Sequence, residues 1–119
     1  MCRILVVDDE PDLRFSLRRI FERAGHEVAD AGHGAQALEC VRVSLPELVV
    51  TDMMMPVMNG HELIRRLRAD PATAHIPILA LTGNGELAGS ADALLAKPYQ
   101  PDQILAAANT LLASQGDRT

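Results

Sequence analysis

The amino-acid sequence predicts an α/β protein built on one doubly wound, five-stranded parallel sheet. Short runs rich in Val, Ile and Leu alternate with segments of helical periodicity along the whole chain. Such alternation is typical of a parallel sheet with helices on both faces. The 119 residues have the length of one domain. We predict a domain at residues 1–114 and a polar tail or linker stub at 115–119.

The first two expected strands enclose a helix that has clear start and stop signals. The strands are expected at residues 3–8 and 26–31, where apolar and β-branched residues gather. Pro11 stands at a first-turn position of the intervening helix, and Gly25 ends it. Its apolar face repeats at helical spacing and consists of Leu13, Leu17, Ile20, Phe21 and Ala24.

The remaining strands are expected at residues 48–52, 76–82 and 93–96, each an apolar run. Two further helices show apolar residues on one face. The helix before residue 48 carries Ala37, Leu38 and Val41. The last helix follows Pro101, and its expected buried stripe consists of Ile104, Leu105, Ala108, Leu111 and Leu112.

Another helix is expected after the strand at 48–52, with a capping signal at its start. The Asn59 side chain can cap it, and Glu62 three residues later completes a pair that resembles a capping box. The helix should end near Asp70-Pro71, because a residue before proline avoids the helical conformation. The residues expected to face inward are Leu63, Ile64 and Leu67.

Composition and charge exclude several classes of protein. The net charge of −5 and the absence of a Lys/Arg stripe argue against nucleic-acid binding by this chain. Cys2 and Cys40 are too few for a disulfide framework, so we expect small thiols in a reducing cytoplasm. No apolar run approaches the roughly 18 residues that a membrane span requires. We therefore expect a cytoplasmic protein without membrane contact.

Polar groups follow four of the apolar runs at the point where each run ends. These are Asp8 and Asp9, then Asp52, Thr82 and Lys97. Ligands of a doubly wound sheet bind outside the carboxyl ends of its strands. If the first and third strands are neighbours, three carboxylates converge there. Each pair of charges about 4 Å apart repels by roughly 4 kcal/mol at an effective dielectric near 20, so a cation is needed.

The chemistry of this set points to Mg²⁺ and to phosphoryl transfer. All-oxygen ligation without nearby Cys or His favours Mg²⁺ over zinc. Asp52 would be the nucleophile, Lys97 would neutralise phosphoryl oxygens, and Thr82 would donate to one of them. Taken singly, each residue also has a structural interpretation, as a turn residue, helix-start acid or solvated amine. It is the coincidence at four strand ends that favours function.

Four motifs in this order resemble the receiver domain of two-component response regulators. They are ILVVDDEPD, DMMMPVMNG, PILALTG and AKPY, and the resemblance extends from about Arg3 to Leu112. It implies a flavodoxin-like sheet of strand order 2-1-3-4-5. It also implies a phosphoryl-accepting switch rather than an enzyme, with a sensor histidine kinase or phosphotransfer protein as donor and an unknown downstream protein partner.

The resemblance assigns a role to each matching position. Asp52 matches the phospho-acceptor, Thr82 the switch hydroxyl and Lys97 the lysine of the pattern. Gly60 and Pro56 match residues that shape the loop after Asp52, and the Lys97-Pro98 peptide is expected to be cis. The expected metal ligands are Asp8, Asp9, Asp52 and the backbone carbonyl of Met54.

Two other functions remain open at this point. A haloacid-dehalogenase-like phosphatase also combines an aspartate nucleophile with Mg²⁺, Thr and Lys, but its nucleophile follows the first strand in an Asp-x-Asp pattern. A pseudo-receiver would act as a protein–protein adaptor without taking phosphate. The kinase, the oligomeric state, and whether the domain stands alone or belongs to a larger regulator stay open.

The segment between Thr82 and Lys97 departs from the receiver pattern. Only residues 83–96 lie between them, and a strand of about 5 residues leaves too few for an average helix of about 11. The fourth helix of receivers is therefore expected to be shortened or missing, which amide exchange across 84–90 would test. Leu94 stands where receivers usually carry an aromatic residue, so the readout of phosphorylation is expected to run through 83–91 or through the first helix.

Overall fold

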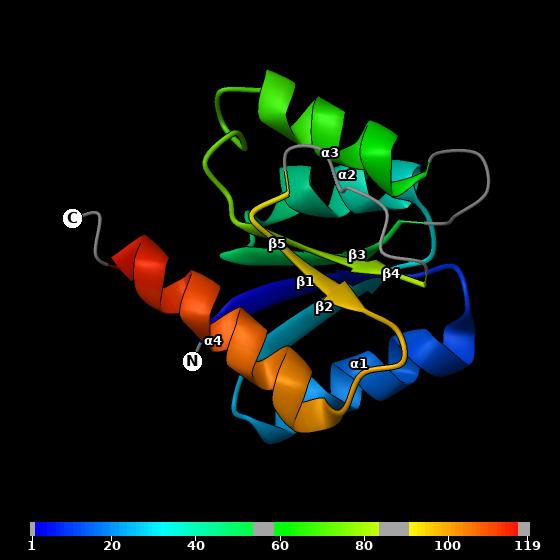
Figure 1. The fold of residues 1–119 in the computed structure, drawn as a ribbon. Coiled ribbons are helices and arrows are strands. Elements are labelled where there is room, and N and C mark those ends of the chain that lie inside the picture. The colour runs from blue at the N-terminus through cyan, green and yellow to red at the C-terminus, as the bar shows by residue number, and fades with distance from the viewer. Residues whose placement is uncertain (1, 54–58, 84–90, 117–119) are drawn as a thin grey trace.

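A parallel sheet separates two pairs of helices in this structure. The computed structural model describes residues 2–53, 59–83 and 91–116. Figure 1 shows α2 and α3 on one face of the sheet and α1 and α4 on the other. This three-layer arrangement confirms the predicted doubly wound α/β fold.

The sheet has five parallel strands in the order β2-β1-β3-β4-β5, as the family resemblance implied. The register pairs Val7 with Thr51 and Asp52 with Leu81, so the ends of these strands meet at one edge. The strand bounds are β1 Arg3–Val7, β2 Glu27–Ala31, β3 Leu48–Asp52, β4 Ile78–Thr82 and β5 Ala93–Ala96.

The helices in the described ranges are α1 Pro11–Arg23, α2 Gly34–Val43, α3 Gly60–Ala69 and α4 Pro101–Gly116. Pro11 begins α1 and Pro101 begins α4, as predicted. The expected loss or shortening of a helix between β4 and β5 concerns residues 84–90, which lie outside the described residues. None of the helices in the described ranges combines the length and apolar character that a membrane span requires.

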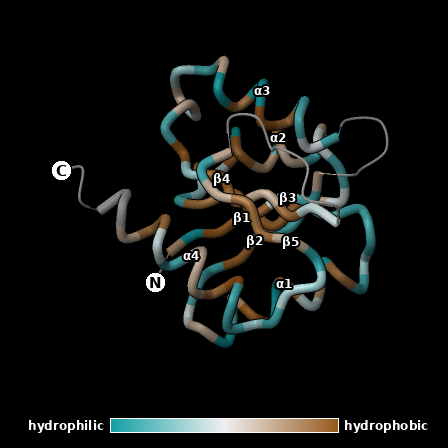
Figure 2. Tube along the Cα trace, viewed as in Figure 1, coloured by the Kyte–Doolittle hydropathy of each residue, from teal (hydrophilic) through white to brown (hydrophobic). Residues whose placement is uncertain are grey.

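Each face of the sheet has its own apolar core. Figure 2 shows the hydrophobic residues, in brown, gathered at the centre of the molecule. On the α2 and α3 side, Leu63, Ile64 and Leu67 are at most 2% exposed. On the α1 and α4 side, Phe21 and Ile104 are fully buried. Burial of such a side chain contributes about 1.5–3 kcal/mol to stability. These two cores therefore hold the helices against the two faces of the sheet.

Three expectations about element bounds and burial need correction. Ala24, expected on the apolar face of the first helix, is exposed and follows the last residue of α1. The fourth strand begins at Ile78 rather than at 76, because the Ile76 N–H bonds back to the Thr73 carbonyl and Pro77 has no N–H to donate. Leu13, expected in the buried face of α1, is 38% exposed. It lines a pocket together with Lys97, which follows the last strand.

Helix α3 begins where the backbone returns to the end of β3. The Asn59 side chain accepts a hydrogen bond from the Glu62 N–H at 3.0 Å, which confirms the predicted cap. The Gly60 N–H donates to the Met53 carbonyl at 3.2 Å. A Cβ at Gly60 would lie 2.7 Å from the Asp52 carbonyl oxygen, so only glycine fits this close approach.

Candidate functional site

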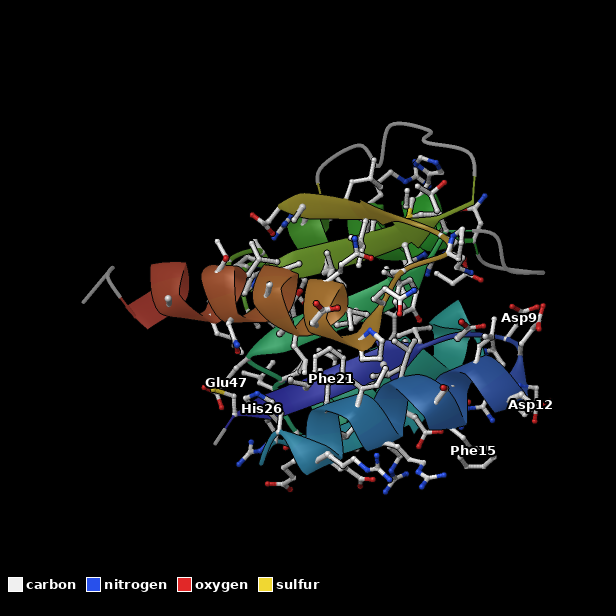
Figure 3. All side chains as sticks on the ribbon, turned by 60° about the horizontal axis from the view of Figure 1, so that its bottom comes forward. Asp9, Asp12, Phe15, Phe21, His26 and Glu47 are labelled. Atoms are coloured by element: carbon white, nitrogen blue, oxygen red, sulfur yellow. The ribbon has the colours of Figure 1, made fainter. Side chains whose placement is uncertain are left out.

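The predicted site residues lie together at the carboxyl edge of the sheet. Asp8 follows β1, Asp52 ends β3, Thr82 ends β4 and Lys97 follows β5. Because β1, β3, β4 and β5 are consecutive neighbours, these side chains share one edge. Figure 3 shows Asp9 at this edge, with His26 and Glu47 at the opposite end of the molecule.

Three carboxylates form an acidic cluster at this edge. Asp8, Asp9 and Asp52 each offer one oxygen, and these atoms lie within 4.8 Å of one another. Asp8 and Asp52 are 1% and 5% exposed. Such crowded, partly buried carboxylates repel one another, and the cluster could hold a metal ion. Met54, whose carbonyl is the fourth expected ligand, lies outside the described residues.

Lys97 supplies positive charge to the cluster. Its Nζ lies 3.1 Å from Asp52 Oδ1, with the two side chains 26% and 7% exposed. The Lys97 backbone N–H donates to the Thr82 carbonyl at 2.7 Å, which ties β5 to the end of β4 beside the buried Thr82. The Lys97-Pro98 peptide is cis, as expected. The structure thus brings together Asp52, Thr82 and Lys97.

The electrostatics of the cluster are most evident at Asp8. Burial is the main cause that raises the pKa of the Asp8 carboxyl above its ordinary value, and the neighbouring Asp52 charge adds to it. The Glu10 backbone N–H, 2.9 Å from Asp8 Oδ1, acts in the opposite direction. Asp8 Oδ2 is buried and has no hydrogen-bond partner among the described residues. An additional cation would satisfy this oxygen.

Tyr99 is a neighbour of the site that the sequence did not indicate. It is half-buried and lines the pocket with Leu13, Gly83 and Lys97. Burial, followed by the charges of Asp8 and Asp52, raises the pKa of Tyr99 to about 12. The phenol therefore stays neutral at physiological pH and adds no negative charge.

The single tyrosine allows a direct test of this environment. We expect its absorbance titration to have a midpoint above 10 and near 12, and Asp52→Asn should lower the midpoint because one of the causes is removed. The unfolded chain releases this proton first, so the free energy of unfolding should fall as the pH rises from about 10 towards about 12. A midpoint at or below 10 would contradict this description.

Comparison with known proteins identifies the family. The model for "Response regulator receiver domain" matches residues 4–109. DNA-binding response regulator MtrA of Mycolicibacterium smegmatis is 40% identical over 111 residues, covering 87% of this chain and 47% of MtrA. Protein PilH of Pseudomonas aeruginosa is 33% identical over 121 residues, covering 95% of this chain and 99% of PilH.

A solved structure agrees with the sequence matches. Chemotaxis response regulator CheY4 of Vibrio cholerae has a TM-score of 0.88 at 29% identity, covering 93% of this chain and 98% of that chain. The chain spans about half the length of MtrA and of response regulator Rre1 from Synechocystis sp., at 47% and 52%. The match of the receiver-domain model to most of the chain places it in a class of regulatory signalling domains. This chain belongs to the receiver domains of two-component response regulators.

Proposed function

We propose that this domain is a phosphoryl-accepting switch in which Asp52 receives the phosphoryl group of a phosphohistidine. The observation that carries the proposal is the buried Asp52 carboxylate, paired at 3.1 Å with Lys97 and adjacent to two further acids. The donor would be a sensor histidine kinase or phosphotransfer protein in the cytoplasm. Membership of the receiver family supports this assignment.

The donor set fits Mg²⁺ as the metal. Mg²⁺ is a hard cation that takes oxygen ligands, usually including one or two carboxylates. The three carboxylate oxygens already lie within 4.8 Å of one another, and Asp8 Oδ2 is buried without a hydrogen-bond partner among the described residues. We propose Asp8, Asp9, Asp52 and the Met54 carbonyl as the residues that would hold it. Bound Mg²⁺ would supply positive charge to the phosphoryl oxygens.

Three side chains of this domain would take part in the phosphoryl transfer itself. An oxygen of Asp52 forms a bond to phosphorus, while the P–N bond breaks and its electron pair goes to the histidine nitrogen. Lys97 would neutralise a phosphoryl oxygen, and the Thr82 hydroxyl would donate to another. Burial of Asp52 limits the access of competing water. The acyl phosphate then alters the interaction with a downstream partner.

The two alternatives are less well supported. A dehalogenase-like phosphatase would need its nucleophile after β1, whereas Asp52, the carboxylate paired with Lys97, ends β3. The family match is also to receivers. A pseudo-receiver would not take phosphate, and the presence of Asp8, Asp9, Asp52 and Lys97 at one edge of the sheet argues against it. Because Leu94 is not aromatic, we propose that the readout differs from that of receivers with an aromatic residue there.

Phosphorylation of the intact chain tests the proposal. We expect incubation with Mg²⁺ and a small acyl phosphate to add the mass of one phosphoryl group to the wild-type protein. Asp52→Ala should show no addition, and EDTA should abolish it in the wild type. Equal incorporation in wild type and Asp52→Ala would reject the proposal, whereas absence of incorporation with every donor would favour the pseudo-receiver.

A further inference from the structure

Arg14 contacts the acidic site from outside the set of residues that the receiver motifs define. It lies in the first turns of α1, and its Nη1 donates to the Asp8 carbonyl at 2.9 Å. Its Nε donates to Asp30 Oδ2, on β2, at 2.8 Å. The Arg14 side chain is only 19% exposed. The guanidinium therefore connects the end of β1 with the neighbouring strand.

Three contacts fix the position of Asp8. Its N–H donates to the Ala31 carbonyl at 3.1 Å, and its Oδ1 accepts from the Glu10 N–H at 2.9 Å. Arg14 binds the carbonyl group. The polar atom that remains is Oδ2, which is buried and without a partner among the described residues. Arg14 thus belongs to the frame that determines where this oxygen lies.

We propose that Arg14 is a positioning residue that orients Asp8 for metal binding. The inference rests on the proposed function, since it takes the acidic cluster to be the Mg²⁺ site. Outer-shell partners hold metal ligands in place, and their loss typically weakens metal affinity about 10- to 100-fold. The fit around the guanidinium is close, because a Cβ at Gly32 would lie 3.2 Å from Arg14 Nη1.

Positioning and plain electrostatics predict opposite effects of removing this charge. Arg14 is a cation next to a cation site, so Coulomb repulsion alone would make Mg²⁺ bind more tightly after Arg14→Gln. If Arg14 positions Asp8, the same variant binds Mg²⁺ more weakly. The direction of the change therefore separates the two roles.

Arg18 provides a matched control. Its Nη1 pairs with Asp30 Oδ1 at 2.8 Å, so it shares the Asp30 carboxylate with Arg14 on the same helix. The hydrogen bonds and ion pairs of Arg18 go to Asp30 and Glu22, and not to Asp8. Arg18→Gln removes the same charge and one contact to the same carboxylate, but leaves the Asp8 carbonyl bonded.

Calorimetric titration of the full chain with Mg²⁺ tests the inference, with urea unfolding in EDTA as the measure of stability. We expect Arg14→Gln to weaken Mg²⁺ binding about tenfold, and Arg18→Gln to leave it within about twofold of the wild type or tighter. Should Arg14→Gln not fold, Arg14→Lys serves, since an ammonium cannot reproduce the two-sided contact. A weakening of about threefold or more is then expected.

The outcomes separate this inference from the proposed function. If the wild type binds no Mg²⁺, the proposed metal site is wrong, and the proposed role of Arg14 is then wrong as well. If the wild type binds Mg²⁺ but the Arg14 variants bind as tightly or more tightly, the positioning role alone is overturned. Equal weakening in the Arg14 and Arg18 variants would also overturn it, because a general loss of structure would then explain both.

Discussion

Gly60→Ala is expected to lower the free energy of unfolding by about 2–3 kcal/mol, the upper part of the range for overpacked sites. The added Cβ would lie 2.6 Å from Met53 Sδ and 2.7 Å from the Asp52 carbonyl oxygen and from Met53 Cα. Two of these atoms belong to the backbone, so a side-chain rotation cannot relieve the contact. The start of α3 must move away from β3.

Urea denaturation of the two proteins measures this effect, and Gly83→Ala is the matched control. A Cβ at Gly83, also at the carboxyl edge of the sheet, meets no atom of the described residues within 4 Å. We therefore expect the control to change stability by less than about 0.5 kcal/mol, as substitutions away from special features do. If Gly60→Ala were as stable as Gly83→Ala, the close approach of α3 to β3 would be wrong.

Lys97→Met is expected to slow phosphorylation of Asp52 by about 100-fold, the usual scale for losing one donor to a developing oxyanion. Mg²⁺ binding should become tighter at the same time. In the structure the Lys97 ammonium, 3.1 Å from Asp52 Oδ1, neutralises the same carboxylate that the metal would bind. Without the Lys97 ammonium, no positive charge of this residue competes with Mg²⁺ for the carboxylates, so the metal should bind more tightly.

A time course of phosphoryl incorporation by mass spectrometry and a calorimetric Mg²⁺ titration measure the two effects separately. Arg42→Met is a suitable control, because its guanidinium is 78% exposed and pairs with Glu39 on α2. Both quantities should match the wild type in this control. Unchanged phosphorylation in Lys97→Met would show that the amine is not part of the reaction.

Much of the candidate site could be predicted because parallel strands end at a common edge. Once Asp8, Asp52, Thr82 and Lys97 were recognised as strand-end residues, the sheet order was enough to bring them together. The cap at Asn59 was also predictable, because it depends on residues three apart in the sequence. These features follow from local patterns combined with the strand order that the family resemblance implied.

Other features depend on three-dimensional contacts that no sequence period expresses. Leu13 has the spacing of a core residue, yet it is 38% exposed and lines a pocket together with Lys97. In the sequence, Arg14 has the features of an ordinary surface charge on a helix. Its proposed role depends on the hydrogen bond from its guanidinium to the Asp8 carbonyl. The burial of Tyr99 near two acids depends on how the segment after Lys97 packs. Such contacts become evident only in the folded molecule.

Location of the phosphoryl group is the most direct test of the central claim, that the carboxylate ending β3 is the phospho-acceptor. After incubation with Mg²⁺ and an acyl phosphate, borohydride reduction converts a phosphorylated aspartate into homoserine, which peptide mass spectrometry can locate. We predict homoserine at position 52 and unmodified Asp8 and Asp9. Homoserine at position 8 or 9 with Asp52 unmodified, or phosphate retained on a borohydride-resistant hydroxyl, would contradict the account.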